Sequence, residues 1–458
     1  MITRSPRRRR PSRALFTALA VASVLAVPAV SSAQANGAIV QGPIPGAVPG
    51  DPASPVLSET YPFFSTWQDL VRSQYVEQEY YVSGVADAYS TAGVKLASNV
   101  PYRTRILIRR PLSNVRFNGT VLVEWQNVTA GYDLDALWNR RHLREGYAWV
   151  GVSAQRVGVD QLRGWSPTRY GSLDVTGSGA FMGDELSYDI FAQAAQALKS
   201  PGEVDPLRGL DVERILAIGA SQSAGRMTVY YNVVLPQEQP VFDGYAFIVG
   251  SAPSRVGPEP IIQVLSETDV TNPATRRPDS DVFRRWEVAG AAHSGWEGQE
   301  YRRPLQIRDL GAAPVYNCTN PPWSRVLLSQ PIEAAYGHLA RWVDGGAPPP
   351  HAPYLEFNGT TKVRNELGLA QGGIQLSQVA VPTALNTGSN SGELFCFLFG
   401  THVPFSDAQL DALYRSHGDY VSAVVHTDLA NLGAGYLLPA DAREDLKEAA
   451  HSDVGKSK

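Results

Sequence analysis

Residues 215–225 read ILAIGASQSAG, and this stretch decides the fold. Its apolar first half is typical of a buried strand, and a helical segment follows the small residues. A strand that turns sharply into a helix needs small residues at the turn, and it lifts the apical side chain above the sheet edge. We expect Ser221 at this apex because the strand is predicted to end at Gly219. Ser223 is the alternative, since SQSAG centres the same pattern two residues later.

Strands alternate with helical segments on both sides of this turn. Alternating polarity predicts opening antiparallel strands at 75–89 and 102–109. Short apolar runs predict further strands at 121–125, 147–152, 215–219, 245–249, 261–265 and 285–289. Apolar spacing and stop signals predict helices at 186–198, 333–343 and near 407–416. The alternation indicates an α/β fold with a mainly parallel central sheet and helices on both faces.

Shifts in composition divide the chain into four segments. Residues 1–35 combine arginines, a short apolar run and small residues, and they predict a signal peptide. Residues 36–56 are rich in Gly, Pro and Ala, which predicts a flexible lead-in. The helix at 333–343 stops at two glycines followed by three prolines. We therefore expect the α/β core at 57–346 and a C-terminal elaboration packed on that core at 347–458.

Charge and hydropathy indicate the compartment of the protein and the classes of partner that it can bind. Removal of residues 1–35 would take away six arginines and no acidic residue, and would change the formal charge from −4 to −10. An acidic surface disfavours nucleic acid and anionic membranes. The apolar run at 14–30 is interrupted and short for a membrane span, so no stable insertion is expected after cleavage. We expect export to the periplasm or the exterior, and the oligomeric state stays open.

Cys318 and Cys396 are the only cysteines of the chain. An even pair in an oxidising compartment is a candidate disulfide, so a bond between them is predicted, and two buried thiols are the alternative. No grouping of Cys and His has the spacing of zinc ligands. Neither a metal nor another cofactor is expected.

A serine hydroxyl becomes a nucleophile only beside a base, and that base needs an orienting acid. The run SETD at 266–269 follows the strand predicted at 261–265. Open α/β sheets build their sites at this edge. We expect Asp269 to be the acid because it lies further into the loop, and Glu267 is the alternative.

His293 is the expected base, since it lies in a loop of small residues after the last predicted strand. The other histidines precede the serine or lie in a predicted helix or in tail segments: His142, His338, His351, His402, His417, His426 and His451. An oxyanion hole needs two backbone N–H groups. We expect them from Gln222, which follows Ser221, and from Asn127 or Gln126 in the loop after the strand at 121–125.

These residues resemble the α/β-hydrolase superfamily, in which serine, acid and histidine follow one another in this order. Four stretches look like a large bacterial family labelled only α/β hydrolase domain: VLVEWQNVTAGYDLDALW at 121–138, YAWVGVSAQ at 147–155, GASQSAGR at 219–226 and GGIQLSQVAVP at 372–382. The resemblance covers most of the chain after the predicted signal peptide. It implies an α/β-hydrolase core and carries Ser221, Asp269 and His293 over as a triad. The general elbow is Gly-x-Ser-x-Gly, and here Ser223 replaces the second glycine.

The resemblance and the candidate residues together predict an exported serine hydrolase that cleaves carboxylic esters through an acyl-enzyme intermediate. Its substrate is expected to be a small-molecule or polymeric ester. A serine peptidase or acyltransferase on the same fold remains an alternative, because the triad serves all three chemistries. A non-catalytic binding protein that resembles hydrolases is the second alternative.

Overall fold

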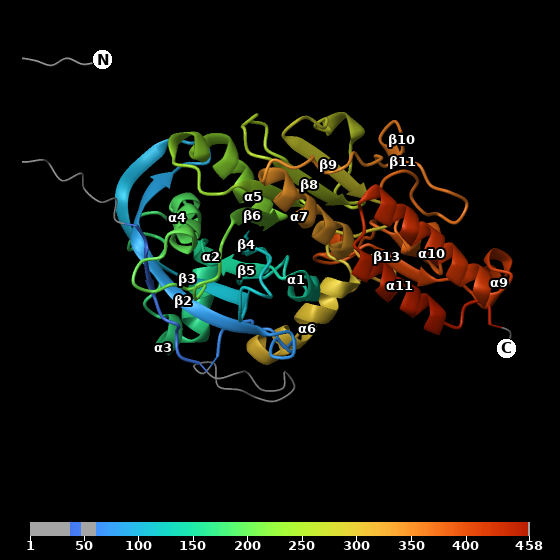
Figure 1. Cartoon of the computed structure of the whole chain (residues 1–458), viewed down its shortest axis with the longest axis horizontal. Coiled ribbons are helices and arrows are strands. Elements are labelled where there is room, and N and C mark those ends of the chain that lie inside the picture. The colour runs from blue at the N-terminus through green and yellow to red at the C-terminus, as the bar shows by residue number, and fades with distance from the viewer. Residues whose placement is uncertain (1–36, 47–60, 457–458) are drawn as a thin grey trace, which may run out of the picture. The chain divides into compact units, whose positions relative to one another are not determined.

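A nine-stranded sheet organises the chain, in the order β1-β2-β3-β5-β4-β6-β7-β8-β9 (Figure 1). Its strands are β1 (Ile39–Gln41), β2 (Tyr75–Tyr89), β3 (Lys95–Pro111), β4 (Thr120–Trp125), β5 (Ala148–Val152), β6 (Arg214–Ala220), β7 (Gly244–Ile248), β8 (Ile261–Ser266) and β9 (Phe283–Val288). The pairs β1–β2, β2–β3 and β3–β5 are antiparallel. All other neighbouring pairs of the sheet, from β5–β4 to β8–β9, are parallel. The predicted α/β fold with a mainly parallel sheet is confirmed.

The computed structural model describes residues 37–46 and 61–456. From Gly37 onward the chain forms one compact unit. The predicted signal peptide lies outside the described residues, as does most of the predicted lead-in. Within the described part of that lead-in, β1 pairs with Tyr81, Val82 and Ser83 of β2, so this piece is a strand and not a loose segment. No helix in the described ranges has the length and apolarity to cross a membrane.

The parallel part of the sheet is covered on both faces, and its sequence reflects that. Every residue of β4, β5, β7, β8 and β9 is buried, and in β6 only Arg214 is partly exposed. Continuous apolar runs are expected where crossover helices cover both faces. Among these helices, α4 (Ser187–Lys199) packs on β2, α5 (Gln222–Val229) on β6, and α7 (Ser329–Val343) on β7 and β8.

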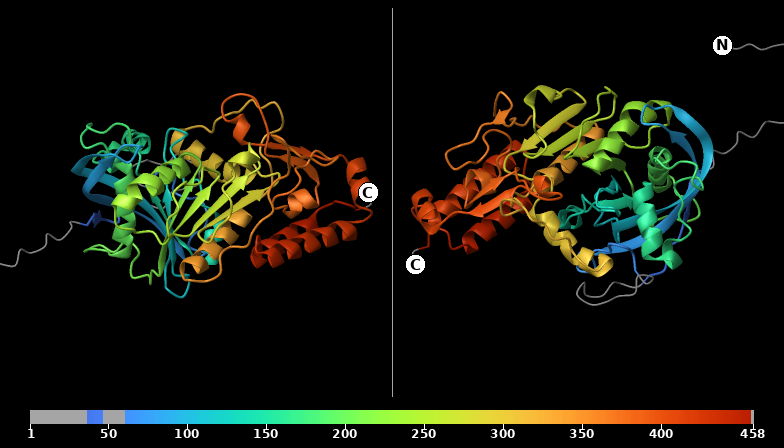
Figure 2. Two further views of the ribbon diagram at one scale, coloured as in Figure 1. Left: turned by 90° about the horizontal axis from the view of Figure 1, so that it is seen from above. Right: turned by 180° about the vertical axis from the view of Figure 1, so that it is seen from behind.

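The remaining elements cluster at the two ends of the core. The other helices are α1 (Arg140–Glu145), α2 (Arg156–Trp165), α3 (Pro167–Tyr170), α6 (Trp296–Leu310), α8 (Ser377–Ala380), α9 (Asp407–Leu413), α10 (His417–Ala434) and α11 (Pro439–His451). The short strands β10 (Phe357–Asn358) and β11 (Thr361–Lys362) pair with each other, as do β12 (Ala384–Thr387) and β13 (Thr401–Pro404). In both views of Figure 2 the C-terminal helices lie at the side away from β2 and β3.

The C-terminal region is joined to the edge of the sheet. Ile374 exchanges backbone hydrogen bonds with Glu287 O and Ala289 N–H, at 2.7 and 3.0 Å, and so extends the sheet beyond β9. Leu355 and Val379 belong to the same hydrophobic core as the strands. The predicted helix near 407–416 is present as α9, but α10 and α11 were not predicted. Most of their side chains stay exposed, so their apolar pattern is weak.

Candidate active site

Ser221 lies at the junction of β6 and α5. β6 ends at Ala220, one residue later than predicted, and α5 begins at Gln222. Ser221 has φ 56° and ψ −116°, a region that non-glycine residues rarely adopt. A Cβ at Gly219 would lie 3.1–3.2 Å from backbone atoms of the next turn, which explains the small residue there. This strained turn directs the Ser221 side chain into a cavity.

Ser223 occupies a different environment. It is fully buried, and its Oγ donates to Ala220 O at 2.9 Å. The same Oγ accepts from the Ala220 N–H at 3.0 Å. The hydroxyl therefore braces the backbone of the turn, in the position where the general pattern has glycine. Of the two candidate nucleophiles, only Ser221 lines the cavity.

The structure brings Asp269 and His293 together at the same sheet edge. Asp269 follows β8, His293 follows β9, and His293 Nδ1 lies 2.6 Å from Asp269 Oδ1. Ser266 Oγ donates to Asp269 Oδ2 at 2.5 Å and fixes the carboxylate from its other side. The His293 backbone N–H donates to Thr268 Oγ1 at 3.1 Å. Both ends of the pair are thus held by the loop that carries the acid.

His293 and Ser221 line one cavity without a hydrogen bond between them in the described structure. The imidazole uses Nδ1 for Asp269, which leaves Nε2 as its free ring nitrogen. The bond between nucleophile and base is often long in free enzymes and tightens with substrate. The absence of this bond in the structure is therefore compatible with the predicted roles of the two residues.

Glu267, the alternative acid, does not contact His293. Its carboxylate is fully buried, accepts from the Gly290 N–H at 2.8 Å and pairs with Arg364 at 2.6 Å. Glu267 thus points into the interior, whereas Asp269 meets His293. Glu267 links the exit of β9 to the C-terminal region and has a structural role.

The predicted oxyanion donors fit in part. The Gln222 N–H is the first of α5 and has no partner within the helix. The Asn127 N–H, in contrast, donates to Leu134 O at 3.3 Å, and the Gln126 N–H donates to Val152 O at 3.3 Å. Both of these backbone groups are therefore engaged with other carbonyl oxygens in this structure. Asn127 lines the cavity and its Nδ2 donates to Ala220 O at 2.9 Å, directly before Ser221.

The cavity has a volume of about 700 Å³ and aromatic walls. Its aromatic lining consists of Trp67, Tyr132, Trp138, Trp296, Tyr301, Tyr316, Phe395 and Phe399. The inner wall, defined here as Asn127, Ser221, Val249 and His293, follows the ends of strands. The outer wall, defined as the cavity residues within 296–316 and 394–399, comes from α6, the loop after it and the C-terminal region.

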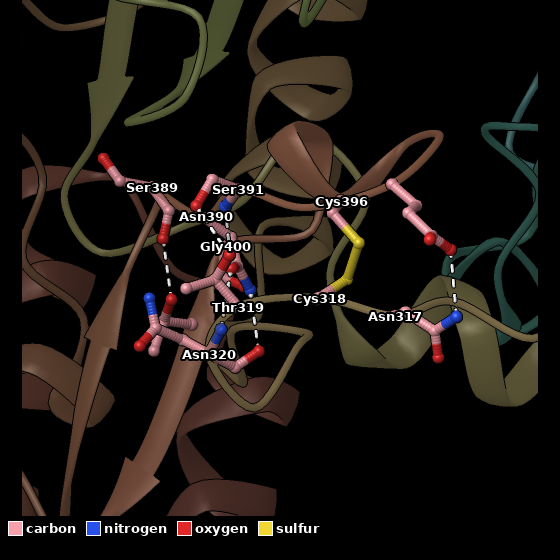
Figure 3. The surroundings of a disulfide bond; sticks show 11 residues. Asn317, Cys318, Thr319, Asn320, Ser389, Asn390, Ser391, Cys396 and Gly400 are labelled. Atoms are coloured by element: carbon pink, nitrogen blue, oxygen red, sulfur yellow. Dashed lines mark hydrogen bonds between the residues drawn. A yellow bond between two sulfur atoms is a disulfide. The ribbon is translucent and has the colours of Figure 1, made fainter.

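A disulfide between Cys318 and Cys396 fastens the outer wall, as predicted (Figure 3). Backbone and side-chain bonds surround it: the Thr319 N–H donates to Ser391 O at 2.8 Å, and Asn390 Nδ2 donates to Asn320 O at 3.1 Å. The bond joins the loop after α6 to the segment of Phe395 and Phe399. Two distant parts of the chain thereby form one wall.

Sequence reasoning missed several residues that hold or line the site. Ser266 and Thr268 position the acid and the base, and their only signal was a loop rich in hydroxyl side chains. Gln222 Nε2 donates to Gln155 Oε1 at 2.6 Å, and Gln155 ends the stretch YAWVGVSAQ, in which no single residue was assigned a role. Arg302 lines the cavity from α6. The sequence did not single it out because α6 contains many other charged residues.

The chain matches one protein family and is similar to several solved structures. A family model described as alpha/beta hydrolase domain matches residues 40–447. The chain has no match among curated proteins. Among solved structures, it is similar to esterase Est22 at 12% identity and TM-score 0.27, over 43% of this chain and 66% of that chain. Oligopeptidase B from Trypanosoma brucei matches at 11% identity and TM-score 0.31, over 53% and 38%. A putative dienelactone hydrolase from Klebsiella pneumoniae matches at 11% and 0.24, over 43% and 74%.

Proposed function

We propose a function on the premise that the chain belongs to the alpha/beta hydrolase domain family. The protein is an exported serine hydrolase that cleaves carboxylic esters. The main support is the 2.6 Å contact between His293 Nδ1 and Asp269 Oδ1, together with the cavity that His293 and Ser221 both line. A base oriented in this way beside a strained serine has no evident purpose in folding.

In the first half-reaction Ser221 Oγ attacks the ester carbonyl carbon, and its proton passes to His293 Nε2. Asp269 holds the imidazole through Nδ1 and stabilises the imidazolium that forms. The tetrahedral intermediate then breaks its bond to the alcohol oxygen. That oxygen takes the proton from Nε2, the alcohol leaves, and an acyl ester remains on Ser221.

In the second half-reaction a water molecule gives a proton to His293 Nε2 and attacks the acyl carbon. The intermediate releases the carboxylic acid, and Ser221 Oγ recovers its proton from Nε2. In both halves the negative oxygen needs donors. We assign this role to the Gln222 N–H and to the second amide hydrogen of Asn127 Nδ2, whose first hydrogen bonds Ala220 O.

The volume of the cavity supports the proposed substrate, and the disulfide supports the proposed export. A cavity of about 700 Å³ with aromatic walls is suited to a small-molecule ester. The disulfide between Cys318 and Cys396 is compatible with export, because such bonds persist in oxidising compartments. The predicted signal peptide at residues 1–35 would direct the protein to export.

The test is turnover of 4-nitrophenyl acyl esters by the full-length protein, combined with a fluorophosphonate label located by mass spectrometry. We expect ester hydrolysis, a single adduct on Ser221, and protection of that serine by ester substrate. An adduct on Ser223 would contradict the assignment of the nucleophile. Preferential cleavage of a matched peptide amide would replace the esterase by a peptidase, and absence of both label and turnover would contradict a catalytic role.

A further inference from the structure

Arg302 is a cationic side chain in the cavity wall without an anionic partner. It lies on α6, and its Nη2 donates to Ser294 Oγ at 2.7 Å. Ser294 directly follows His293, so the guanidinium and the imidazole belong to one region of the cavity. Among the described residues, no Asp or Glu oxygen lies within 4.0 Å of the guanidinium.

Two fully buried arginines of β3 differ in this respect from Arg302, which is partly buried. Arg105 pairs with Glu79 at 2.7 Å and Arg109 with Asp135 at 2.6 Å. Burial of a charge is costly unless the charge is paired. Burial lowers the pKa of the Arg302 guanidinium, whereas in Arg105 the effect of burial is more than offset by Glu79 and the pKa is raised. Folding alone thus gives no reason for the environment of Arg302.

The charged neighbours of Arg302 are committed elsewhere. Asp135 is the carboxylate whose charge acts on the pKa of Arg302, and its Oδ2 accepts from both Arg109 and Tyr301 OH. Glu297, also in the wall, pairs with Arg141 at 2.5 Å. Glu300, the other acid of the wall, is exposed to solvent. The positive charge of Arg302 therefore remains available to a ligand.

The helix also makes room for the guanidinium. A Cβ at Gly298, one turn earlier, would lie 3.1 Å from Arg302 Nη1 and 3.3 Å from Nη2. The side chain thus folds back along α6, toward the end of the helix that follows His293. Tyr132 and Tyr316 lie close enough that the charge of Arg302 works against the rise that burial gives to the pKa of each hydroxyl. The charge of Arg302 thus acts on two hydroxyl groups of the aromatic lining.

We propose that Arg302 binds a carboxylate of the substrate, so that the preferred esters carry a carboxylate on the acyl or the alcohol part. The guanidinium presents N–H groups in a planar fork that matches a carboxylate. The aromatic lining buries the apolar remainder of such a molecule. This assignment of a substrate class rests on the proposed ester hydrolysis at Ser221.

The test measures kcat/KM for two matched ester pairs. Mono-4-nitrophenyl glutarate and 4-nitrophenyl pentanoate differ by a carboxylate on the acyl part. Acetoxybenzoate, substituted in the para position, and its methyl ester differ by a carboxylate on the alcohol part. We expect the wild type to prefer the charged ester by about tenfold or more in at least one pair. Arg302→Gln should reduce that preference at least about tenfold, and Arg303→Gln, an exposed neighbour, should leave it unchanged.

A preference that Arg302→Gln leaves intact, or a wild type without preference in both pairs, contradicts the proposal. If no ester is turned over, ester hydrolysis fails as a function, and the anion site is judged by calorimetric titration of benzoate into the full-length protein. Benzoate binding that Arg302→Gln abolishes and Arg303→Gln retains supports the site. Absence of benzoate binding, or binding that is indifferent to Arg302, overturns it.

Discussion

The inner and outer walls of the cavity are built in different ways. On the inner wall, Ser221 and His293 follow β6 and β9 within a few residues, and Asp269 follows β8 in the same manner. On the outer wall, α6 and the segment 394–399 are far apart in sequence and are joined through the Cys318–Cys396 bond. The inner wall inherits its geometry from hydrogen-bonded parallel strands, whereas the outer wall depends on long-range packing.

We therefore expect the inner wall to carry out the reaction and the outer wall to determine which substrates bind. Groups that follow strands of one parallel sheet stay in fixed mutual positions, which suits proton transfer over a single hydrogen bond. Groups on the outer wall contact the bulk of a ligand, and Arg302 is among them. Changes on the inner wall should therefore act mainly on kcat, and changes on the outer wall mainly on KM and stability.

The largest effect is expected at the nucleophile. Ser221→Ala should lower kcat by roughly 10⁴-fold or more with the fold retained, because the covalent step is lost. Ser223→Ala should keep most of kcat and lower the free energy of unfolding by about 1–2 kcal/mol, since it removes two hydrogen bonds of the turn. Steady-state kinetics and thermal melts of both variants test this. The reverse ranking of kcat would mean that Ser223 is the nucleophile.

The orienting acid comes next. Asp269→Asn should lower kcat by roughly 10³–10⁴-fold without unfolding, because an amide favours the wrong histidine tautomer. The matched control is Glu267→Gln, which removes a buried partner of Arg364 and should lower Tm more than it lowers kcat of the folded protein. An inactive but stable Glu267→Gln beside an active Asp269→Asn would exchange the two roles.

A smaller loss on the inner wall is expected at Asn127. Asn127→Ala removes the amide that we assign to the oxyanion and should lower kcat by about 10²-fold with little change in KM. Gln68→Ala, at an amide that also lines the cavity but lies away from β6, serves as a control and should keep kcat. A loss confined to KM would remove Asn127 from the oxyanion hole.

On the outer wall, the double variant Cys318→Ser, Cys396→Ser should lower the free energy of unfolding by about 2–4 kcal/mol, because the bond closes a loop of 78 residues. The segment of Phe395 and Phe399 would then be less constrained, so KM should rise more than kcat falls. Denaturant unfolding and ester kinetics measure both effects. An unchanged KM would show that the wall keeps its shape without the bond.

The smallest expected effect on catalysis comes from the helices α10 and α11, whose buried acids should instead make the stability depend on pH. Burial raises the pKa of Asp428 to about 6 and that of Asp445 to about 7. Aspartate in the unfolded chain has a pKa of about 3.9, so the folded protein holds extra protons between roughly pH 4 and 7. This stabilisation is fully present below about pH 4 and is lost as the pH rises through 7.

We expect the free energy of unfolding to fall by roughly 4 kcal/mol between pH 5 and pH 8, about one third of it from Asp428 and the rest from Asp445. Asp428→Asn combined with Asp445→Asn should flatten this fall, and Asp411→Asn, at an exposed aspartate of α9, should not. Thermal melts across this range test the prediction. An unchanged fall in the double variant would show that neither carboxylate is protonated in the folded protein.

Much of the fold could be read from local patterns. The buried strands β4 to β8 appear as apolar runs, whereas β9 carries Arg284, Arg285 and Glu287. The predicted bounds of all six strands agree with the structure within two residues. The helices α10 and α11 escaped prediction because they expose most of their side chains and carry buried acids such as Asp428 and Asp445 at core positions. Their burial results from packing against other segments and leaves no apolar stripe in the sequence.

The sequence by itself determined the sheet, the turn at residues 219–223, the loops that carry the candidate acid and base, and the pairing of the only two cysteines. These features depend on local periodicity and on the rule that parallel strands end at one edge. Only the tertiary structure decided that Ser221 faces the cavity while Ser223 braces the turn, and that Asp269 meets His293 while Glu267 binds Arg364. It also decided that Arg302 enters the wall without an anionic partner. The direction of a side chain and the charges around it depend on segments distant in sequence, which no local pattern encodes.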